Sequence, residues 1–549
     1  MRDRVRIFGF SLVVLAAGVL PSLAQEGIEY VGGRQAAARQ VLVKFRSLGP
    51  LTVAQLRKTY DLDRVQGIGG TGVYVLRSRS RSAQALLQSP AVRRDVQYAE
   101  PDYILRASDL PNDPRFGEQW ALQNVGQTIL GSPGTAGADV SATNAWTISS
   151  GGVGNVVAIV DTGVDYGHPD LTANIWSAST AFSVRIGNRV ITCPAASHGY
   201  DAIRNTCDPL DDNSHGTHVA GIIGAVGDNG EGISGVNWTT QMLASKFLTA
   251  KGTGTTSNAI DAIEFAIQLK NIGLANVRVM SNSWGGTVNS KALMDAVSRA
   301  MQSNILFVAS AGNLSANNDT SPFYPASYDL PNVLSVTAID HHDAVLSSSN
   351  IGPASVDLGA PGAFILSTVP SSFVASGYDY MSGTSMAAAY VSGAATLMLA
   401  ACPDLNTMDA RSVLMDTVQT TSALSSSTVT GGRVNVDQAI QACNVPAFML
   451  SATPPSVTVA QGSDAIYTIQ MAPTSGFAGT AALTVEGVPT GASSAFDSGL
   501  VGPQGAATLT VSISSSTPLG TYLLTVKGSS GDVVRTTPLW LVVTRASRK

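Results

Sequence analysis

Hydrophobic and polar positions divide the chain into three regions with different patterns. Between residues 25 and 106, alternating stretches that predict strands, such as Gln40–Phe45, are interspersed with stretches of helical spacing, such as Thr52–Tyr60. In residues 107–443, short apolar runs alternate with longer helical ones. From about Val445 onward, only strand-like stretches separated by turn residues remain. We therefore expect a small α+β unit, a larger α/β domain and an all-β sandwich.

The middle region has the pattern of a parallel sheet. Apolar runs of strand length occur at Val156–Val160, Val277–Met280 and Ile305–Ala309, and apolar stretches of helix length occur at Ala259–Leu269 and Met386–Ala401. Buried strands that alternate with helices predict an α/β domain whose sheet carries helices on both faces. In such domains the functional site lies at the carboxyl ends of the strands.

The C-terminal region, residues 445–549, is rich in Thr, Ser, Ala, Val and Gly and contains no Cys. Turn residues separate six expected strands, at Ser456–Val459, Ala465–Ile469, Ala482–Val485, Ala507–Ile513, Tyr522–Val526 and Trp540–Val543. This pattern is typical of an immunoglobulin-like β-sandwich. The region holds no cluster of reactive side chains, so binding to surfaces or polysaccharide, a spacer, a secretion aid and removal on maturation are all open roles.

The first residues have the pattern of a secretory signal peptide. Three arginines among the first six residues precede the apolar run Ile7–Leu20, and small residues at Ser22 and Ala24 provide a cleavage site after Ala24. The alternative is a membrane anchor, but the run is short for a complete span. We therefore expect residues 1–24 to be removed and the product to be secreted, without a stable membrane anchor.

Composition and charge narrow the classes of partner. Of the 549 residues, 44% are hydrophobic and 13% are charged, which is a globular composition. The net charge of −5 gives no reason to expect binding to nucleic acid or to a membrane surface. Residues 25–106 hold 13 basic and 7 acidic side chains, whereas residues 107–549 hold 17 basic and 30 acidic ones. This split favours docking of the small unit on the larger part, with chance composition as the alternative.

The four cysteines are interpreted in the light of secretion. Cys193 lies close in sequence to Cys207, and Cys402 lies closer to Cys443 than to either of them. Three connectivities are available, and we expect the two short-range disulfides because an oxidising compartment permits them. A zinc site is the alternative, but these cysteines have no Cys-x-x-Cys spacing and no clustered His beside them.

Two segments of the middle region place polar side chains where catalysis could use them. Asp161 directly follows the apolar run Val156–Val160 and precedes Gly163, so its carboxylate would stand at the carboxyl end of a buried strand. Taken alone, it could be a turn or helix-cap residue. His215 and His218 are three residues apart. Alone, either could be a buried structural histidine, and a metal pair would lack the Glu of the metalloprotease helix.

A third segment, Ser382–Ala389, leads from a Gly-containing turn into an apolar helix. Ser385 stands at the helix start, where unpaired amides and the positive end of the helix dipole favour negative charge, although alone it could be a plain N-cap. Together the three segments supply a nucleophile, its base and a carboxylate that orients the base. The order Asp161, His215, Ser385 is one of the known orders of this constellation.

On these motifs, residues 110–443 resemble the subtilisin-like serine proteases, or subtilases. The three motifs are long, intact and in the family's order. The resemblance implies Asp161, His215 and Ser385 as the catalytic triad, and it gives His218 a structural role. It implies no cofactor for catalysis.

The resemblance extends to the oxyanion hole. The segment Val308–Asn313 matches the family segment whose Asn amide, together with the backbone N–H of the nucleophile, binds the oxyanion of the tetrahedral intermediate. It therefore implies that Asn313 is a catalytic residue, and a turn residue after Gly312 is the alternative.

Two further segments match the family's substrate-binding strands, and an extended peptide would lie between them as an added strand. They contribute Ser283, Trp284 and Gly285 on one side, and Gly252, Thr253 and Gly254 on the other. Because main-chain hydrogen bonds do not read sequence, broad endopeptidase specificity is expected. Leu314 and Phe323 are expected at the primary pocket, where no Asp or Glu is evident, so apolar side chains should be accepted and Phe323 would narrow the pocket.

Calcium is implied as a structural partner. Family members often bind it through an early Gln, the Asp of His-Pro-Asp-Leu and a loop after the His helix. Gln119, Asp170 and the loop Asp228–Ile233, with Asn229, match in order, although the loop departs from the family pattern by about one residue. Oxygen ligands of this kind suit the cation.

The small unit also fits the resemblance. Tyr98–Leu105 is similar to the end of a subtilase propeptide, which inhibits the enzyme and assists its folding. We therefore expect a propeptide at residues 25–108, a catalytic domain at 109–444 and self-cleavage near Arg106–Asp109. The polar, proline-containing stretch Arg106–Asp113 is typical of a linker.

These observations predict a secreted, monomeric serine endopeptidase that hydrolyses proteins or peptides through an acyl-enzyme and is made as a self-processed precursor, inhibited by its own propeptide. The alternative is a catalytically silent relative that binds partners through its β-sandwich. The intact triad and Asn313 argue against it. His341 and His342 lie in a polar segment and are predicted to be solvated.

Overall fold

The computed structural model describes two compact units, Met1–Leu105 and Arg106–Lys549. The described residues are 27–31, 34–46, 50–89, 96–104, 110–443, 447–474, 477–531 and 533–545. The expected signal segment, residues 1–24, and the expected processing junction, Arg106–Asp109, lie outside them.

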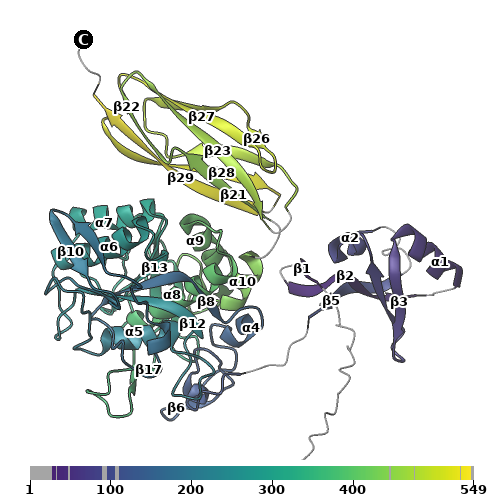
Figure 1. Cartoon of the computed structure of the whole chain (residues 1–549), viewed down its shortest axis with the longest axis horizontal. Coiled ribbons are helices and arrows are strands. Elements are labelled where there is room, and N and C mark those ends of the chain that lie inside the picture. Colours follow the sequence, from purple (N-terminus) through teal and green to yellow (C-terminus); the bar gives the residue numbers. More distant parts are fainter. Residues whose placement is uncertain are drawn as a thin grey trace, which may run out of the picture. The chain divides into compact units, whose positions relative to one another are not determined.

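The first unit is the small α+β fold that its mixed pattern predicted (Figure 1). Its antiparallel sheet has the order β1-β2-β4-β3, with β5 also paired to β2. Val41, Val43 and Phe45 alternate along β2 and fill the core. The elements are β1 (Ile28–Val31), β2 (Arg34–Phe45), α1 (Pro50–Thr59), β3 (Leu62–Ile68), β4 (Val73–Ser78), α2 (Ala83–Leu87) and β5 (Val96–Tyr103).

The second unit is built on a nine-stranded sheet of order β11-β12-β8-β13-β14-β15-β16-β20-β19. Every neighbouring pair is parallel except β19 and β20, which confirms the predicted parallel sheet. The strands are β8 (Gly151–Asp161), β11 (Gly199–Asp201), β12 (Thr239–Lys246), β13 (Val277–Asn282), β14 (Leu306–Ser310), β15 (Val333–Ile339), β16 (Leu358–Pro361), β19 (Gln419–Thr420) and β20 (Gly432–Arg433).

Helices cover both faces of this sheet, and the alternation of side chains along β8 shows why. Val157 and Ile159 enter one hydrophobic core, while Val156, Ala158 and Val160 enter the other. The first core is closed by α4 (Ala142–Trp146), α5 (His215–Gly224), α8 (Thr384–Ala401), α9 (Thr407–Asp416) and α10 (Val436–Cys443). The second is closed by α6 (Thr256–Asn271) and α7 (Lys291–Gln302).

Helix α8 is the central helix of the first core. Its 18 residues have a mean hydropathy of 1.3, which matches a membrane span by length and composition. However, 83% of that stretch is buried inside the fold, as expected of the core helix of a globular domain.

Short elements occupy the connections around the sheet. Between β8 and β11 lies the antiparallel hairpin of β9 and β10, which the sequence pattern did not predict. The short elements are β6 (Thr128–Ile129), β7 (Ser132–Pro133), β9 (Phe182–Ile186), β10 (Arg189–Cys193), β17 (Ile365–Thr368), β18 (Tyr378–Met381) and the 3₁₀ turns Phe116–Glu118 and Thr172–Asn174.

The C-terminal region is a two-sheet β-sandwich, as predicted (Figure 1). One sheet has the order β21-β23-β27-β25 and the other β22-β29-β28-β24-β26. Phe448, Tyr467 and Leu541 are fully buried in the sandwich core. The strands are β21 (Ala447–Thr453), β22 (Ser456–Ala460), β23 (Asp464–Thr474), β24 (Ala481–Glu486), β25 (Ala492–Phe496), β26 (Leu500–Val501), β27 (Ala506–Ile513), β28 (Gly520–Ser530) and β29 (Val533–Thr544).

Candidate active site

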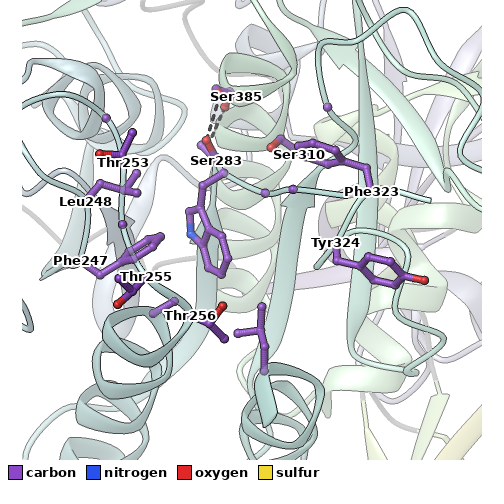
Figure 2. Close-up of a pocket in the computed structure, with 18 of the residues that line it drawn as sticks. Phe247, Leu248, Thr253, Thr255, Thr256, Ser283, Ser310, Phe323, Tyr324 and Ser385 are labelled. Atoms are coloured by element: carbon purple, nitrogen blue, oxygen red, sulfur yellow. Dashed lines mark hydrogen bonds between the residues drawn. The ribbon is translucent and has the colours of Figure 1, made fainter. Parts of the chain in front are cut away.

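A cleft of about 560 Å³ lies at the carboxyl ends of the central strands. Strand β8 ends at Asp161 and β14 at Ser310, and the chain beyond Ser310 lines the cleft. His215, Asn313 and Ser385, which are far apart in sequence, all line it, and Figure 2 labels Ser385 among the lining residues. The structure thus brings together the polar side chains that the motifs singled out.

Asp161 and His215 form the carboxylate–imidazole pair of the site. Asp161 is fully buried, and its Oδ1 lies 2.7 Å from Nδ1 of His215. Because a carboxylate only accepts, Nδ1 donates, and the other ring nitrogen, Nε2, is left as the proton acceptor. Burial alone would lower the pKa of His215. The charge and the hydrogen bond of Asp161, with a contribution from Asp211, outweigh burial and raise that pKa above its ordinary value of 6.5.

A buried network fixes the start of α5, and with it the imidazole. Oγ1 of Thr162 accepts from the Gly216 amide at 2.8 Å and donates to Asp211 Oδ1 at 2.9 Å. The other oxygen of Asp211 accepts from the Thr217 amide at 3.0 Å. A β-carbon on Gly216 would lie 2.1 Å from the Gly163 carbonyl oxygen, so only glycine lets α5 approach the end of β8 this closely.

Ser385 is the second residue of α8, whose N-cap is Gly383. Its Oγ donates to the Ser283 carbonyl at 3.1 Å, and Ser283 Oγ donates back to the Ser385 carbonyl at 2.9 Å (Figure 2). In the first turn of a helix, backbone amides have no carbonyl partner within the helix and carry the positive end of its dipole. A hydroxyl at this place is thus next to donors that favour negative charge.

Asn313 lines the cleft, and its side chain is held through its oxygen. Its Oδ1 accepts from the Thr384 amide at 2.9 Å and from Thr384 Oγ1 at 3.0 Å, which uses the oxygen end of the side chain. The Nδ2 group remains as a donor beside the start of α8. Gly383 leaves room for it, since a β-carbon there would come within 3.2 Å of Nδ2.

Comparison with known proteins decides the family. Residues 152–438, more than half of the chain, match the model of the subtilase family. The chain belongs to the subtilase family. A thermophilic serine proteinase of Bacillus sp. (strain AK1) is 36% identical over 304 residues, which are 55% of this chain and 63% of that protein. Thermitase of Thermoactinomyces vulgaris is 35% identical over 289 residues, 52% of this chain and 85% of thermitase.

An extracellular protease of Xanthomonas campestris pv. campestris is 34% identical over 378 residues, 66% of this chain and 62% of that protein. The matched part of this subtilase therefore spans less than two thirds of the length of two of these three relatives.

The walls of the subtilase cleft are the segments expected from the sequence. Six of the predicted substrate-binding residues line it, namely Gly252, Thr253, Gly254, Ser283, Trp284 and Gly285, and so does Phe323. Trp284 packs against the Phe247 ring with centroids 4.7 Å apart. Leu314 is not among the lining residues, and its side chain is 59% exposed. Among the described residues that line the cleft, none is Asp or Glu.

The three residues expected to bind calcium meet at one loop. Asp170 Oδ1 accepts from Asn229 Nδ2 at 2.9 Å, and its Oδ2 accepts from the Ile233 amide at 3.0 Å. Gln119 is less available to a cation than expected, because its side-chain amide is already paired with the Ser234 backbone. Its Oε1 accepts from the Ser234 amide at 2.8 Å, and its Nε2 donates to the Ser234 carbonyl at 2.7 Å.

Asp113 joins this group, although its sequence position suggested a linker. Its Oδ2 accepts from the Asp228 amide at 2.8 Å, while its buried Oδ1 has no hydrogen-bond partner among the described residues. Burial raises the pKa of Asp113, and it raises that of Asp170 to about 6. Among the described residues, no group of three or more His, Cys, Asp or Glu could hold a metal ion, so a cation here would also need amide and backbone oxygens, which suit calcium.

The other histidines singled out in the sequence lie away from the cleft lining. His218 is fully buried, its Nε2 contacts the Ile365 carbonyl oxygen at 3.0 Å, and burial lowers its pKa to about 3, so the ring is neutral. The prediction that His341 is solvated was wrong. His341 is 3% exposed and packs against Trp120, with ring centroids 5.8 Å apart, while only His342 is exposed.

Both expected disulfides are confirmed. Cys193 is joined to Cys207 and Cys402 to Cys443, and among the described residues no cysteine is free. The first disulfide ties the end of β10 to the segment that leads into Asp211. The Pro209 carbonyl of that segment accepts from the Val164 amide at 3.1 Å, so the disulfide holds a loop that packs beside the end of β8.

Proposed function

We propose that this subtilase is a secreted serine endopeptidase that cleaves peptide bonds through an acyl-enzyme. The observation that carries the proposal is the 2.7 Å contact of the buried Asp161 with His215, in a cleft that His215 shares with Ser385 and Asn313. Subtilases need no cofactor for this reaction.

In the acylation step, His215 Nε2 accepts the proton of the Ser385 hydroxyl while Oγ attacks the scissile carbonyl carbon. The carbonyl oxygen becomes an oxyanion, which accepts hydrogen bonds from Asn313 Nδ2 and from the Ser385 backbone amide. His215 then gives its proton to the leaving amine, and the acyl group stays on Oγ. Water repeats the sequence, with His215 as its base, and frees Ser385.

The peptide would lie between the Gly252–Gly254 segment and the Ser283–Gly285 segment as an additional strand. Recognition through main-chain groups supports broad sequence specificity. The absence of carboxylates from the described cleft lining disfavours basic residues at the cleavage site and supports an apolar preference.

The first unit would act as the propeptide. Its basic composition complements the acidic remainder of the chain, which supports docking of the small unit on the larger part. Self-cleavage near Arg106–Asp109, removal of residues 1–24 and export as a monomer complete the proposed pathway. The name of the Xanthomonas relative, an extracellular protease, supports export.

Calcium would bind between the N-terminal segment of the catalytic domain and the loop after α5. Asp113, Asp170 and Asn229 would hold it, and the unpartnered oxygen of Asp113 is the feature that supports this. The cation would compensate two neighbouring buried carboxylates and has no part in the chemical step.

Hydrolysis of casein by the secreted protein tests the proposal, with Ser385→Ala as the variant and N-terminal sequencing of both products. We expect hydrolysis that a serine-directed covalent inhibitor abolishes, and a mature N-terminus near residues 106–109 in the wild type only. A purified Ser385→Ala precursor that still hydrolyses casein would refute the mechanism. One that is still trimmed at the junction, with other proteases absent, would refute self-processing. A wild-type protein without hydrolytic activity would instead support a silent binding relative.

A further inference from the structure

Phe323 occupies the part of the cleft that should receive a substrate side chain. It lies in the described cleft lining, and Figure 2 labels it among the residues of the cleft. Two glycines face its ring. A β-carbon on Gly285 would lie 2.3 Å from Phe323 Cε1, and a β-carbon on Gly312 would lie 3.0 Å from Cδ1. The Cδ1–Cε1 edge of the ring therefore lies close to both backbone segments.

Hydrogen bonds hold the backbone of Phe323 in this place. Its amide donates to Ser327 Oγ at 3.0 Å, and its carbonyl accepts from the Ser327 amide at 2.9 Å. The next residue, Tyr324, exchanges two backbone hydrogen bonds with Gly286, at 2.8 and 2.7 Å. The segment that carries the ring is thus hydrogen-bonded to the same wall that contains Gly285.

The position of the ring relative to the reacting groups identifies the affected subsite. This step rests on the proposed function. A scissile carbonyl bound by Ser385 Oγ and Asn313 Nδ2 lies between Ser283, which accepts from Oγ, and Gly312, which directly precedes Asn313. The side chain of the residue that supplies this carbonyl must then enter between the Ser283–Gly285 segment and Gly312, where the edge of the Phe323 ring lies.

We propose that Phe323 closes the primary specificity pocket, so that the enzyme cleaves after Gly, Ala and Ser and rejects Phe, Leu and other large side chains. A large side chain would have to displace a ring whose edge lies against two backbone segments, and overpacking of this kind is disfavoured. The apolar preference expected from the sequence is thereby restricted to its smallest members. The expected discrimination between Ala and Phe at this subsite is on the order of 100-fold in kcat/KM, the upper part of the range for steric exclusion from an apolar pocket.

The test compares two tetrapeptide p-nitroanilides that differ only in the last residue, Ala or Phe. The wild-type enzyme should favour the Ala substrate on the order of 100-fold, and Phe323→Gly should reduce that ratio to about 1 or reverse it. Both substrates are measured with the same variant, so a general loss of activity lowers both kcat/KM values equally and leaves their ratio unchanged. The control is Phe373→Ala, which truncates a phenylalanine that is 54% exposed and outside the cleft lining, and it should leave the ratio unchanged.

Two results would overturn the proposal. One is a wild-type enzyme that cleaves the Phe substrate as well as the Ala substrate, and the other is an unchanged ratio in Phe323→Gly. If Phe323→Gly is not secreted in folded form, Phe323→Ala is compared with the wild type in the same way. The ratio of kcat/KM for the Ala and Phe substrates in the wild type alone still tests whether large side chains are rejected. A wild-type protein that cleaves neither substrate and is not labelled at Ser385 by a serine-directed inhibitor would mean that the proposed function itself has failed.

Discussion

Asp161→Asn removes the charge beside His215 while it keeps the shape of the side chain. In the wild type, the Oδ1–Nδ1 distance is 2.7 Å and the carboxylate is fully buried. The imidazolium that forms when His215 accepts the Ser385 proton is stabilised by this carboxylate. With charge centres about 4 Å apart and an effective dielectric constant of about 20, the attraction is about 4 kcal/mol. Its loss corresponds to a decrease in kcat of about 10³-fold.

The amide of the variant adds a second effect. Its NH₂ group can face Nδ1 and select the imidazole tautomer that cannot accept the Ser385 proton, so the total decrease in kcat should reach about 10³- to 10⁴-fold. The pH profile should change as well. Asp161 raises the pKa of His215, and a general base must be neutral, so wild-type activity falls as the pH decreases through that raised pKa. In Asp161→Asn, the acid limb of kcat/KM should move to lower pH.

The assay is p-nitroaniline release from the Ala tetrapeptide, measured as kcat and as kcat/KM between pH 4 and 9, a range of about two to three units on either side of the ordinary His pKa. The control is Asp165→Asn, which neutralises a nearby carboxylate that accepts from the Gly167 amide at 3.2 Å. It should change kcat less than about 3-fold, as expected for a residue without a transition-state role. A loss in Asp161→Asn of less than about 10-fold, or an acid limb that does not move, would refute the reasoning.

Three other predictions concern the oxyanion hole, the calcium site and a disulfide. Asn313→Ala should lower kcat by about 10²- to 10³-fold with little change in KM, and an equal loss through KM alone would contradict its assignment as an oxyanion donor. A calcium chelator should lower the melting temperature of the wild type, by the equivalent of about 2.7 kcal/mol if calcium had been present at 100 times its Kd. In Asp113→Asn the chelator should have little effect, and a wild type that is insensitive to chelation would refute the site. Cys193→Ser combined with Cys207→Ser opens a disulfide of sequence separation 14 and should lower the free energy of unfolding by about 3 kcal/mol, and an unchanged urea midpoint would contradict a stabilising role.

The regular elements of the fold were predictable wherever periodicity alone determines them. The helix expected at Ala259–Leu269 lies within α6, and the apolar run Val156–Val160 lies within β8. The hairpin of β9 and β10 was missed. Its strand Phe182–Ile186 is short and partly exposed, and neighbouring elements together with the Cys193–Cys207 disulfide hold it in place, rather than a strong local pattern.

The sequence predicted those residues of the candidate site that belong to long motifs. Residues identified by several adjacent motif positions, such as His215 and Ser385, line the cleft together. Residues whose environment depends on distant parts of the chain were misplaced. Asp113 belongs to a polar, proline-containing stretch, yet the loop at Asp228 buries it. His341 lies between acidic residues, yet Trp120, more than two hundred positions away, covers its ring. Local composition carries no information about such tertiary contacts.

The proposed closure of the pocket by Phe323 also depends on tertiary contacts. The sequence placed this residue at the pocket wall, but whether its ring narrows or fills the space depends on the separation of two backbone segments. Gly285 and Gly312 set that separation, and nothing in the local sequence of Phe323 reports it.

The central claim is that Ser385 is a nucleophile activated by His215 in this cleft. The most direct measurement is labelling of the secreted protein with a fluorophosphonate, followed by mass spectrometry of the modified peptide. The account predicts one adduct, on Ser385, formed at a rate that His215→Ala lowers by at least about 10³-fold, as expected when a nucleophile loses its base. Labelling of another serine, or unchanged labelling of Ser385 in His215→Ala, would contradict it.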